Sequence, residues 1–395
     1  MRILLDGAPM LGRVTGIGQY GLSLLKGLVA LSSERSPSSG AGLEAIGVFD
    51  GREVLTPDAF VSRLSHQAAV GRNQRLKSMI RRIWPSCRDW ADRVRRFHLS
   101  RQTRGACWDV FHEPNFVSPQ YALPLVTTVH DMSYLRYPQF LPKDRLAWLR
   151  RKMGQTLARS RVILTDSHFT RRELLDLCPA VEPQRVVVTQ LGVDFDYYSD
   201  PAHDERVDDV RRRLRLPERF VLFLGTLEPR KNLQGLIAAY GLLPSGLQKS
   251  YPLVLAGMPG WNQAYFRREM GELRRRGVLH EVGYVAQEDV PALMRAASVF
   301  CFPSFYEGFG LPPLEAAACG TPVVSSLAAS LPEVLGEAAV YVNPNSPQDI
   351  AAGLERTLDS DSLRERLKVA GKVRAALFRW DDCATRTVQA YRIAA

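Results

Sequence analysis

The sequence predicts an α/β protein made of two doubly wound domains, each a parallel sheet with helices on both faces. Short apolar runs alternate with amphipathic segments along the chain, which is the pattern of parallel strands joined by helical crossovers. The alternation pauses between residues 193 and 217 and then restarts. A chain of 395 residues is also long for one domain, so two domains are expected.

The first domain is expected to occupy residues 1–192. Its strands are the apolar runs that end in polar residues, namely "RILLDG", "VFHEPN", "PLVTTVHD", "RVILTDS" and "VVVTQLGVD". The segments "TGIGQYGLSLLKGLVAL" and "PKDRLAWLRRKMGQTLARS" have the spacing of amphipathic helices. Residues 193–217 are polar and charged, and we expect a linker there.

The second domain is expected to occupy residues 218–380. Its strands are "RFVLFLG", "PLVLAG", "HEVGYV", "SVFCFPS", "TPVVSS" and "AVYVNP", and its helices include "LQGLIAAYGLL" and "FRREMGELRRRGVL". Residues 381–395 are expected to form a C-terminal helix that packs back toward the N-terminal domain. Because open parallel sheets bind ligands at the carboxyl ends of their strands, the residues after each strand are the candidates for a site.

Basic residues concentrate in residues 72–104, which carry most of the net charge of +11. Trp84, Trp90 and Phe97 are interleaved with these cations, a composition typical of an amphipathic helix on an anionic membrane. Pro85 is expected to divide the segment into two helices. A solvated surface with the apolar residues in the core is one alternative, and nucleic-acid binding is another.

The sequence points to a cytoplasmic protein. No apolar run approaches the ~20 residues that span a bilayer, and the first residues, "MRILLDGAPM", read as a strand and turn rather than a signal peptide. The six cysteines form no CxxC pair, which favours free thiols in a reducing compartment.

Two cations follow the strand "VLFLG". Arg230 and Lys231 stand in "TLEPRKN", at the carboxyl end of that strand and before a helix. Arg offers forked donors and Lys a point charge, which together suit a diphosphate. A solvated surface pair is the alternative.

Two carboxylates lie eight residues apart in "SFYEGFGLPPLEAAACGTPVVSS", where Glu307 occupies a Gly-rich turn and Glu315 the first turn of a helix. The glycines let backbone N–H groups approach a ligand, and a helix start favours anionic oxygens. Carboxylates repel phosphate but accept hydrogen bonds from diols, so the pattern favours phosphate flanked by hydroxyl-rich groups. The alternatives are a helix-dipole partner for Glu315 and a solvated loop acid for Glu307.

The segment "FYEGFGLPPLEAAACGTPVV" resembles the E-x7-E signature of the retaining glycosyltransferases of family 4, and "LGTLEPRKNLQGLIAAY" is similar to their diphosphate-binding segment. The resemblance covers nearly the whole chain. It implies a GT-B fold, with two Rossmann-like domains facing each other across a cleft. The forms "GTLEPRKN", "YEGFGLPPLEA" and "SLPEV" resemble the mannosyl- and rhamnosyltransferases of bacterial surface polysaccharide assembly.

The resemblance implies a role for each acid and cation. Glu307 is expected beside the reacting face of the donor sugar, and Glu315 on the ribose hydroxyls of the nucleotide. Lys231 is expected to neutralise the departing diphosphate, with Arg230 nearby. Many members carry Arg directly after the Gly that ends this strand, whereas Thr226 stands there in this chain. Arg230 is a candidate for supplying the missing charge.

The remaining donor-binding residues that the resemblance implies fall in short segments. The turn expected to contact sugar and phosphate consists of Gly308, Phe309, Gly310 and Leu311. The base pocket is expected to consist of Gly283, Tyr284 and Val285. In the N-terminal domain, the residues expected near the donor are Gly16 and Gly18 of "TGIGQY" and His130 of "VHDMS". His112, Glu113 and Asn115 of "FHEPNF" are candidates for binding the acceptor.

No metal site and no cofactor are expected. Asp194 and Asp196 form a "DFD" motif, but it follows "LGV" where this family commonly has "GVD", so we reject the metal interpretation. The resemblance implies retention at the anomeric carbon through an oxocarbenium-like transition state. Whether Glu307 attacks covalently or orients the sugar stays open.

The expected activity is transfer of mannose from GDP-mannose to a lipid-linked saccharide, at the inner face of the cytoplasmic membrane. GDP-rhamnose and UDP- or dTDP-sugars are alternative donors. A nucleotide-sugar epimerase or phosphorylase shares the fold, and a nucleic-acid-binding protein is a more distant alternative. Nucleic acid is not an expected partner.

Overall fold

The computed structural model describes residues 1–11, 16–33, 42–68, 87–105, 107–118, 121–258, 260 and 267–395. The chain forms two compact units. Unit 1 comprises Met1–Leu135, Leu141–Leu191 and Trp380–Ala395, and unit 2 comprises Arg136–Phe140 and Gly192–Arg379. The basic segment expected at residues 72–104 is described only from residue 87 onward, so Trp84 and Pro85 lie outside the described residues.

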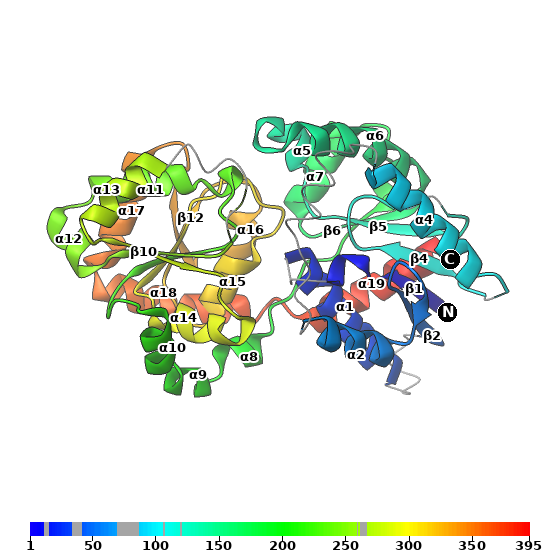
Figure 1. Cartoon of the computed structure of the whole chain (residues 1–395), viewed down its shortest axis with the longest axis horizontal. Helices are drawn as coiled ribbons and strands as arrows, with labels where there is room; N and C mark the ends of the chain where they lie inside the picture. The colour runs from blue at the N-terminus through cyan, green and yellow to red at the C-terminus, as the bar shows by residue number, and fades with distance from the viewer. Residues whose placement is uncertain are drawn as a thin grey trace. The chain divides into compact units, whose positions relative to one another are not determined.

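Unit 1 contains a seven-stranded sheet with the order β3-β2-β1-β4-β5-β6-β7 (Figure 1). Neighbouring strands are parallel except for the antiparallel pair β2 and β3. The inner strands are buried along almost their whole length, which is why they read as continuous apolar runs. The strands are β1 (Arg2–Asp6), β2 (Ala45–Phe49), β3 (Val54–Leu55), β4 (Val110–Glu113), β5 (Leu125–Val129), β6 (Ser160–Thr165) and β7 (Val186–Val188).

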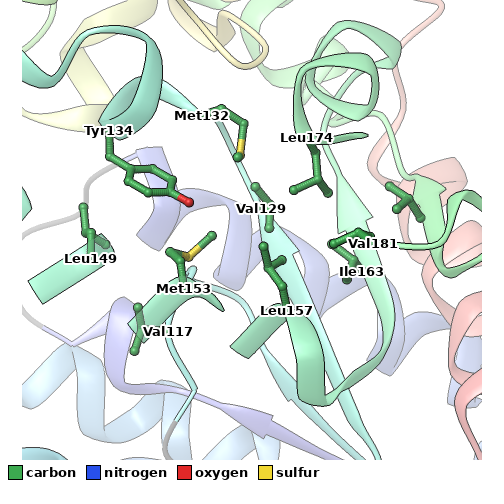
Figure 2. Close-up of a cluster of buried hydrophobic side chains, with 11 residues drawn as sticks. Val117, Val129, Met132, Tyr134, Leu149, Met153, Leu157, Ile163, Leu174 and Val181 are labelled. Carbon is green, nitrogen blue, oxygen red and sulfur yellow. The ribbon is translucent and has the colours of Figure 1, made fainter. Parts of the chain in front are cut away.

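Helices connect these strands, as expected for parallel crossovers. The described helices are η1 (Ala8–Met10), α1 (Gly16–Ser33), α2 (Pro57–Ala68), α4 (Cys87–Gln102), α5 (Ser133–Arg136), α6 (Lys143–Arg159), α7 (His168–Leu177), η3 (Pro183–Arg185) and α19 (Trp380–Ala394). The side chains of α6, α7 and their flanking loops pack on β5 and β6 in one buried cluster, in which Val129, Ile163 and Leu174 are fully buried (Figure 2).

The last helix of the chain belongs to unit 1, where α19 packs against α1 and β6. The two helices approach closely at Gly27, where a Cβ atom would lie 2.7 Å from the Cβ atom of Ala384. The sequence predicted a helix over residues 381–395 that packs back toward the N-terminal domain. A side chain on Gly27 would push the two helices apart.

Unit 2 contains a six-stranded parallel sheet with the order β10-β9-β8-β11-β12-β13. Its strands are β8 (Val221–Leu224), β9 (Leu253–Ala256), β10 (Leu279–Gly283), β11 (Val299–Phe302), β12 (Val323–Ser326) and β13 (Ala339–Val342). Its described helices are η2 (Pro138–Phe140), α8 (Phe195–Ser199), α9 (Ala202–Glu205), α10 (Val207–Leu214), η4 (Pro229–Lys231), α11 (Leu233–Leu242), α12 (Ser245–Ser250), α13 (Arg267–Arg275), η6 (Gln287–Asp289), α14 (Val290–Ala296), α15 (Leu311–Ala318), α16 (Leu331–Leu335), α17 (Pro347–Leu358) and α18 (Asp361–Ala375).

Residues 193–217 differ from the linker expected there. They fold into α8, α9 and α10, which pack on α14 and α15 and belong to unit 2. Val210 is fully buried, and Arg213 donates hydrogen bonds of 2.8 and 3.0 Å to the buried carboxylate of Asp289. One buried apolar residue and one ion pair hold α10 in unit 2. Because most of its other residues are charged, its composition did not indicate a packed helix.

The α/β class and the two doubly wound parallel sheets are confirmed. The five cysteines whose state is described are free, with Cys301, Cys319 and Cys383 buried and Cys107 exposed. Among the helices of the described ranges, none combines the length and the apolar character that crossing a bilayer requires.

Candidate active site

The turn after β8 directs two cations toward the loop that follows β11. Asn232 adopts a left-handed conformation with φ 55°, and its side chain caps α11 by accepting a 3.1 Å hydrogen bond from the Gly235 N–H. Its amide also donates to the carbonyls of Pro303, at 3.0 Å, and Pro344, at 2.6 Å. These bonds fix the turn to the loops after two other strands, so the preceding Arg230 and Lys231 have a defined position.

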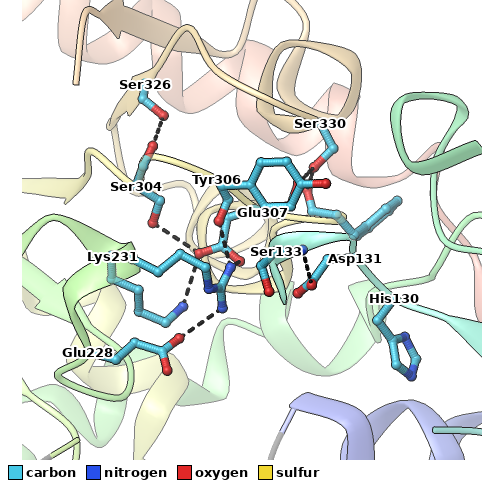
Figure 3. A network of polar contacts seen from close by, with 12 residues as sticks. His130, Asp131, Ser133, Glu228, Lys231, Ser304, Tyr306, Glu307, Ser326 and Ser330 are labelled. Atoms are coloured by element: carbon cyan, nitrogen blue, oxygen red, sulfur yellow. Dashed lines mark hydrogen bonds and ion pairs between the residues drawn. The ribbon is translucent and has the colours of Figure 1, made fainter. Parts of the chain in front are cut away.

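Both cations bind one carboxylate, that of Glu307, and Figure 3 shows its contact with Lys231. Lys231 Nζ lies 3.2 Å from Glu307 Oε1, and Arg230 Nη1 donates to Oε2 at 2.8 Å. The other guanidinium nitrogen of Arg230 donates to Glu228 Oε1 at 2.9 Å. Ser304 Oγ adds a 3.0 Å hydrogen bond to Glu307 Oε1. Glu228 and Ser304 were not among the predicted site residues, because neither residue carries a spacing signal of its own.

Glu307 is ionised at every pH at which the protein is expected to work. Burial alone would raise the pKa of its carboxyl, but the charges of Arg230 and Lys231, with the hydrogen bonds from Arg230 and Ser304, lower the pKa to about 2. A carboxyl group with this pKa cannot donate a proton near neutrality. It can accept hydrogen bonds from hydroxyls or face a developing positive charge.

The turn between Glu307 and α15 brings backbone groups close together. Gly310 has φ 102°, and a Cβ atom there would lie 2.6 Å from Leu331 Cδ2. Ser330 Oγ lies 2.8 Å from the carbonyl oxygen of Glu307 and 3.0 Å from that of Phe309. With Pro312 in the first turn, α15 starts directly after Gly310. Gly308, Phe309 and Gly310 are buried, and Leu311 is half-buried.

Glu315 lies one turn into α15 and is half-buried beside α8. Burial raises the pKa of Glu315 to about 7, although a hydrogen bond from the Tyr198 hydroxyl opposes the shift. The Tyr198 hydroxyl also accepts a 2.8 Å hydrogen bond from Gln287 Nε2. Tyr198 lies in the segment that was expected to be a linker, so sequence reasoning could not pair it with Glu315.

The residues expected to line a base pocket lie at the end of β10. Gly283 has φ 75°, Tyr284 is 53% exposed and Val285 is buried. Thr226, which replaces the more common Arg after β8, is exposed. All these positions belong to unit 2 and follow the carboxyl ends of β8, β10 and β11, where open parallel sheets bind ligands.

His130 lies in unit 1, directly after β5. Its Nδ1 is 2.7 Å from Asp166 Oδ2 and its Nε2 is 2.8 Å from the carbonyl oxygen of Pro114. Burial would lower the pKa of His130, but the Asp166 carboxylate and the Pro114 carbonyl raise it. Since a carbonyl oxygen only accepts, the ring donates from Nε2, and the proton at Nδ1 is shared with Asp166. The expected contact with a donor sugar stays a prediction.

The acceptor candidate His112 is fully buried, and the structure gives it a different role from the one expected. Its Nδ1 lies 2.7 Å from the Tyr391 hydroxyl of α19, and its Nε2 lies 2.8 Å from Thr128 Oγ1. Burial lowers the pKa of His112 to about 3, so the ring is neutral. It therefore joins the last helix to the sheet instead of facing a ligand.

Glu113 lies beside Asp6 and Arg95 at the carboxyl ends of β1 and β4. Burial and the Asp6 carboxylate raise the pKa of Glu113 well above its usual range. Gly16 begins α1 and is exposed, whereas Gly18 is buried; residues 12–15 lie outside the described residues.

Asp194 caps α8 by accepting a 3.3 Å hydrogen bond from the Tyr197 N–H, which accounts for one half of the "DFD" motif. Across the described ranges, no group of three or more His, Cys, Asp or Glu side chains is arranged to hold a metal ion. That the reaction needs no metal stays a prediction.

Two family models match consecutive parts of the chain. The model "Glycosyltransferase Family 4" matches residues 56–197, and the model "Glycosyl transferases group 1" matches residues 205–374. An "O-antigen chain mannosyltransferase B" of Escherichia coli is 35% identical over 406 aligned positions, which cover 100% of both chains.

Solved structures share the fold. The Anabaena protein HepE, in complex with UDP-glucose, has a TM-score of 0.67 at 18% identity, covering 98% of both chains. WaaG, titled a glycosyltransferase involved in lipopolysaccharide biosynthesis, has a TM-score of 0.69 at 15% identity, again over 98% of both chains.

The two sheets, the acid and cation cluster and these matches define the protein as an enzyme that transfers a hexosyl group. The chain belongs to glycosyltransferase family 4 and has the GT-B fold. This membership argues against the epimerase, phosphorylase and nucleic-acid-binding alternatives as its main function.

Proposed function

We propose that the protein transfers mannose from GDP-mannose, with retention, to a lipid-linked saccharide of bacterial surface polysaccharide assembly. The observation that carries the proposal is the joint binding of Arg230 and Lys231 to the buried Glu307. A diphosphate requires such a pair of cations, and a sugar requires such an acceptor of hydrogen bonds. The full-length similarity to an O-antigen chain mannosyltransferase supports mannose as the sugar.

The chemistry follows from the charges. A leaving nucleoside diphosphate gains negative charge in the transition state, and Lys231, Arg230 and the N–H groups at the start of α15 stabilise that charge. Before the donor arrives, Glu307 holds the two cations in place. Once the diphosphate pairs with the two cations, the Glu307 carboxylate accepts hydrogen bonds from the sugar hydroxyls and faces the oxocarbenium-like carbon.

Glu315 is proposed to bind the ribose. A carboxylate accepts two hydrogen bonds, which matches the vicinal hydroxyls of a ribose. Its position one turn after Gly310 supports a ligand that extends from the phosphates at the helix start to the ribose. Gly283, Tyr284 and Val285 are then proposed to contact the base.

The membrane proposal rests on α4, the described part of the basic segment. Trp90 and Phe97 are 55% and 62% exposed, and Arg93 and Arg101 are exposed on the same helix. Aromatic and cationic side chains on one exposed helix favour binding to an anionic bilayer. A lipid-linked acceptor at the inner face of the cytoplasmic membrane requires such docking.

The donor is tested by calorimetric titration of the purified protein with GDP, UDP, ADP and dTDP. We expect GDP to bind most tightly, and a preference for UDP or dTDP would overturn the choice of donor. Transfer is then followed with labelled GDP-mannose and bacterial membranes, and the anomeric configuration of the product is read by NMR. Label that stays out of the lipid fraction, or an inverted product, would contradict the acceptor or the stereochemistry.

Membrane docking is tested by flotation with vesicles of neutral phosphatidylcholine, with and without anionic phosphatidylglycerol. The double variant Trp90→Ala/Phe97→Ala should lose binding to the anionic vesicles. The control variant Val369→Ala/Leu377→Ala removes two equally exposed apolar side chains from unit 2. If both variants float like the wild type, α4 is not the docking surface.

A further inference from the structure

Unit 2 contains a pocket beside the turn that holds Arg230 and Lys231. The pocket has a volume of about 450 Å³ and is lined by the first turns of α11, the loop between β13 and α17, Phe305 and the short helix η2. Figure 1 shows α11 and α17 side by side in this unit. The volume falls within the range of small-molecule sites, about 300–1,000 Å³.

The side chains of the lining favour an uncharged ligand. None of the described residues that line the pocket is charged. A phosphate or a nucleotide would leave water for this pocket without gaining an opposite charge, which is unfavourable. The uncharged side chains therefore suit a neutral occupant.

The same lining also disfavours a plain hydrocarbon chain. Gln139, Gln234 and Asn345, whose side chains end in amides, line the pocket, and these three residues are exposed. Within the described part of the chain, no hydrogen bond holds any of these amides in place. Amides that donate and accept suit hydroxyl groups, which do the same.

Two aromatic rings complete the wall. Phe140 stacks on Phe305 with ring centroids 5.7 Å apart and an angle of 25° between the planes. The negative face of an aromatic ring attracts groups that carry partial positive charge, and the C–H face of a hexopyranose is such a group. Aromatic rings beside uncharged amides are therefore groups that a neutral sugar recognises.

The pocket is joined to the candidate active site. The Phe305 N–H donates a 2.9 Å hydrogen bond to the carbonyl oxygen of Arg230, and Tyr137 stacks on Phe140 while contacting Tyr306. Tyr306 directly precedes Glu307 and accepts a 2.6 Å hydrogen bond from Arg230 through its carbonyl oxygen. A ligand in the pocket would therefore lie against the lining residues that contact the turn of Arg230 and Lys231.

We propose that this pocket is a glycan-binding subsite that holds neutral hexose residues of the growing saccharide acceptor, away from its reacting end. The proposal rests on the proposed function, because it assumes a polymeric saccharide acceptor. It assigns to Phe140, Phe305, Gln234 and Asn345 a role in acceptor length and processivity, not in the transfer step.

The test uses the full-length protein and α-linked mannotriose as the probe, followed by ligand-observed NMR without any donor. The variant Ala238→Tyr places a ring in the pocket from the exposed face of α11, and Ala352→Tyr places the same ring on the exposed face of α17, outside the pocket. We expect Ala238→Tyr to weaken mannotriose binding about tenfold or more, since it fills the site. The control should bind like the wild type.

A second variant, Gln234→Ala/Asn345→Ala, removes two amides without adding bulk and should also weaken binding. With long acceptors, both pocket variants should raise KM while kcat and GDP binding stay at wild-type values. Absence of mannotriose binding by the wild type, or equal binding by Ala238→Tyr and Ala352→Tyr, would overturn the proposal. If GDP-mannose is not the donor, neither the wild type nor any variant would bind GDP, and this result is separate from mannotriose binding.

Discussion

Lys231 Nζ and Glu307 Oε1 lie 3.2 Å apart, and each side chain is only 10% exposed. The two residues follow different strands, β8 and β11, and meet at the carboxyl edge of one sheet. A buried ion pair contributes little net stability, because desolvation opposes the attraction, whereas removing one partner leaves the other charge unpaired. The pair is therefore better explained by what it binds than by folding.

Replacing Lys231 by Ala should abolish most transfer. Removal of one group that stabilises transition-state charge typically lowers kcat by about 100- to 1,000-fold. The fold should persist, since Arg230 still neutralises Glu307. Steady-state kinetics and circular dichroism check both points. The matched control is Lys249→Ala, which removes an exposed lysine of α12; wild-type turnover in Lys231→Ala would refute the diphosphate role.

The low pKa of Glu307 predicts how stability changes with acid. Its pKa is about 2 in the folded protein and about 4.3 in an unfolded chain. The carboxylate therefore stabilises the fold above pH ~4.3, and this contribution is lost as the pH falls toward ~2. Chemical denaturation of Glu307→Gln should show a shallower loss of unfolding free energy below pH 5 than the wild type. Parallel curves would contradict the assigned pKa.

The raised pKa of Glu315 predicts that donor binding depends on pH. Its pKa of about 7 means that the carboxylate fraction rises as the pH passes upward through 7. If the carboxylate binds the ribose, GDP-mannose affinity should rise between pH 6 and 8, by up to about tenfold per pH unit below the pKa. Calorimetry measures this, and the esterified diphosphate of the donor does not titrate in that range.

Glu315→Gln should bind GDP-mannose with an affinity that is almost independent of pH. The control Glu337→Gln, at an exposed position of the same unit, should retain the wild-type slope. An unchanged slope in Glu315→Gln would assign the titration to another group.

Asp166 is predicted to set the charge of His130. The Asp166 carboxylate is the main cause that raises the pKa of His130 against the effect of burial. In Asp166→Asn, burial should dominate and the pKa of His130 should fall below 6.5, the ordinary value. NMR titration of the imidazole Cε1–H follows this. Asp131→Asn, which removes a weaker influence, should produce a smaller shift, and the reverse order would refute the assignment.

Gly257 is predicted to be intolerant of a side chain. Its φ is 134°, and a Cβ atom there would lie 1.9 Å from the carbonyl oxygen of Gly225. Gly257→Ala should lower the unfolding free energy by about 1–3 kcal/mol or more, through backbone strain. Gly271→Ala is the matched control, because a Cβ atom in α13 meets nothing within 4 Å, and helix propensity predicts a gain of up to ~1 kcal/mol. Thermal unfolding distinguishes the two.

The predictable parts of the fold are the strands that form distinct apolar runs between polar segments. The inner strands were found in this way, whereas β2 and β3 were missed, because β2 contains Gly47 and β3 has only two residues. The helices of residues 193–217 were missed for the opposite reason. Their charged residues form ion pairs with distant parts of unit 2, such as the pair of Arg213 with Asp289.

Within the candidate site, the motif residues were predictable and their partners were not. Glu307 and Lys231 stand in segments with recognisable spacing, but Ser304, Tyr198 and Asp166 acquire their contacts only through the tertiary fold. His112 shows the converse. A polar residue near the end of a buried strand suggests a ligand-binding role, yet His112 lies within β4 and its ring bonds to Tyr391, which lies 279 positions further along the chain.

The return of α19 to unit 1 has a consequence for synthesis. The first unit is completed only by Trp380–Ala395, which are synthesised after the whole of unit 2. Domains usually fold in order during translation, but here Tyr391 cannot reach His112, nor Ala384 pack at Gly27, until the residues that follow unit 2 have been synthesised. Unit 2, by contrast, has all its residues once Arg379 has been added. We therefore expect nascent chains truncated before Trp380 to expose an apolar strip of α1 and to require chaperones, which makes the last helix the step that commits the protein to its native state.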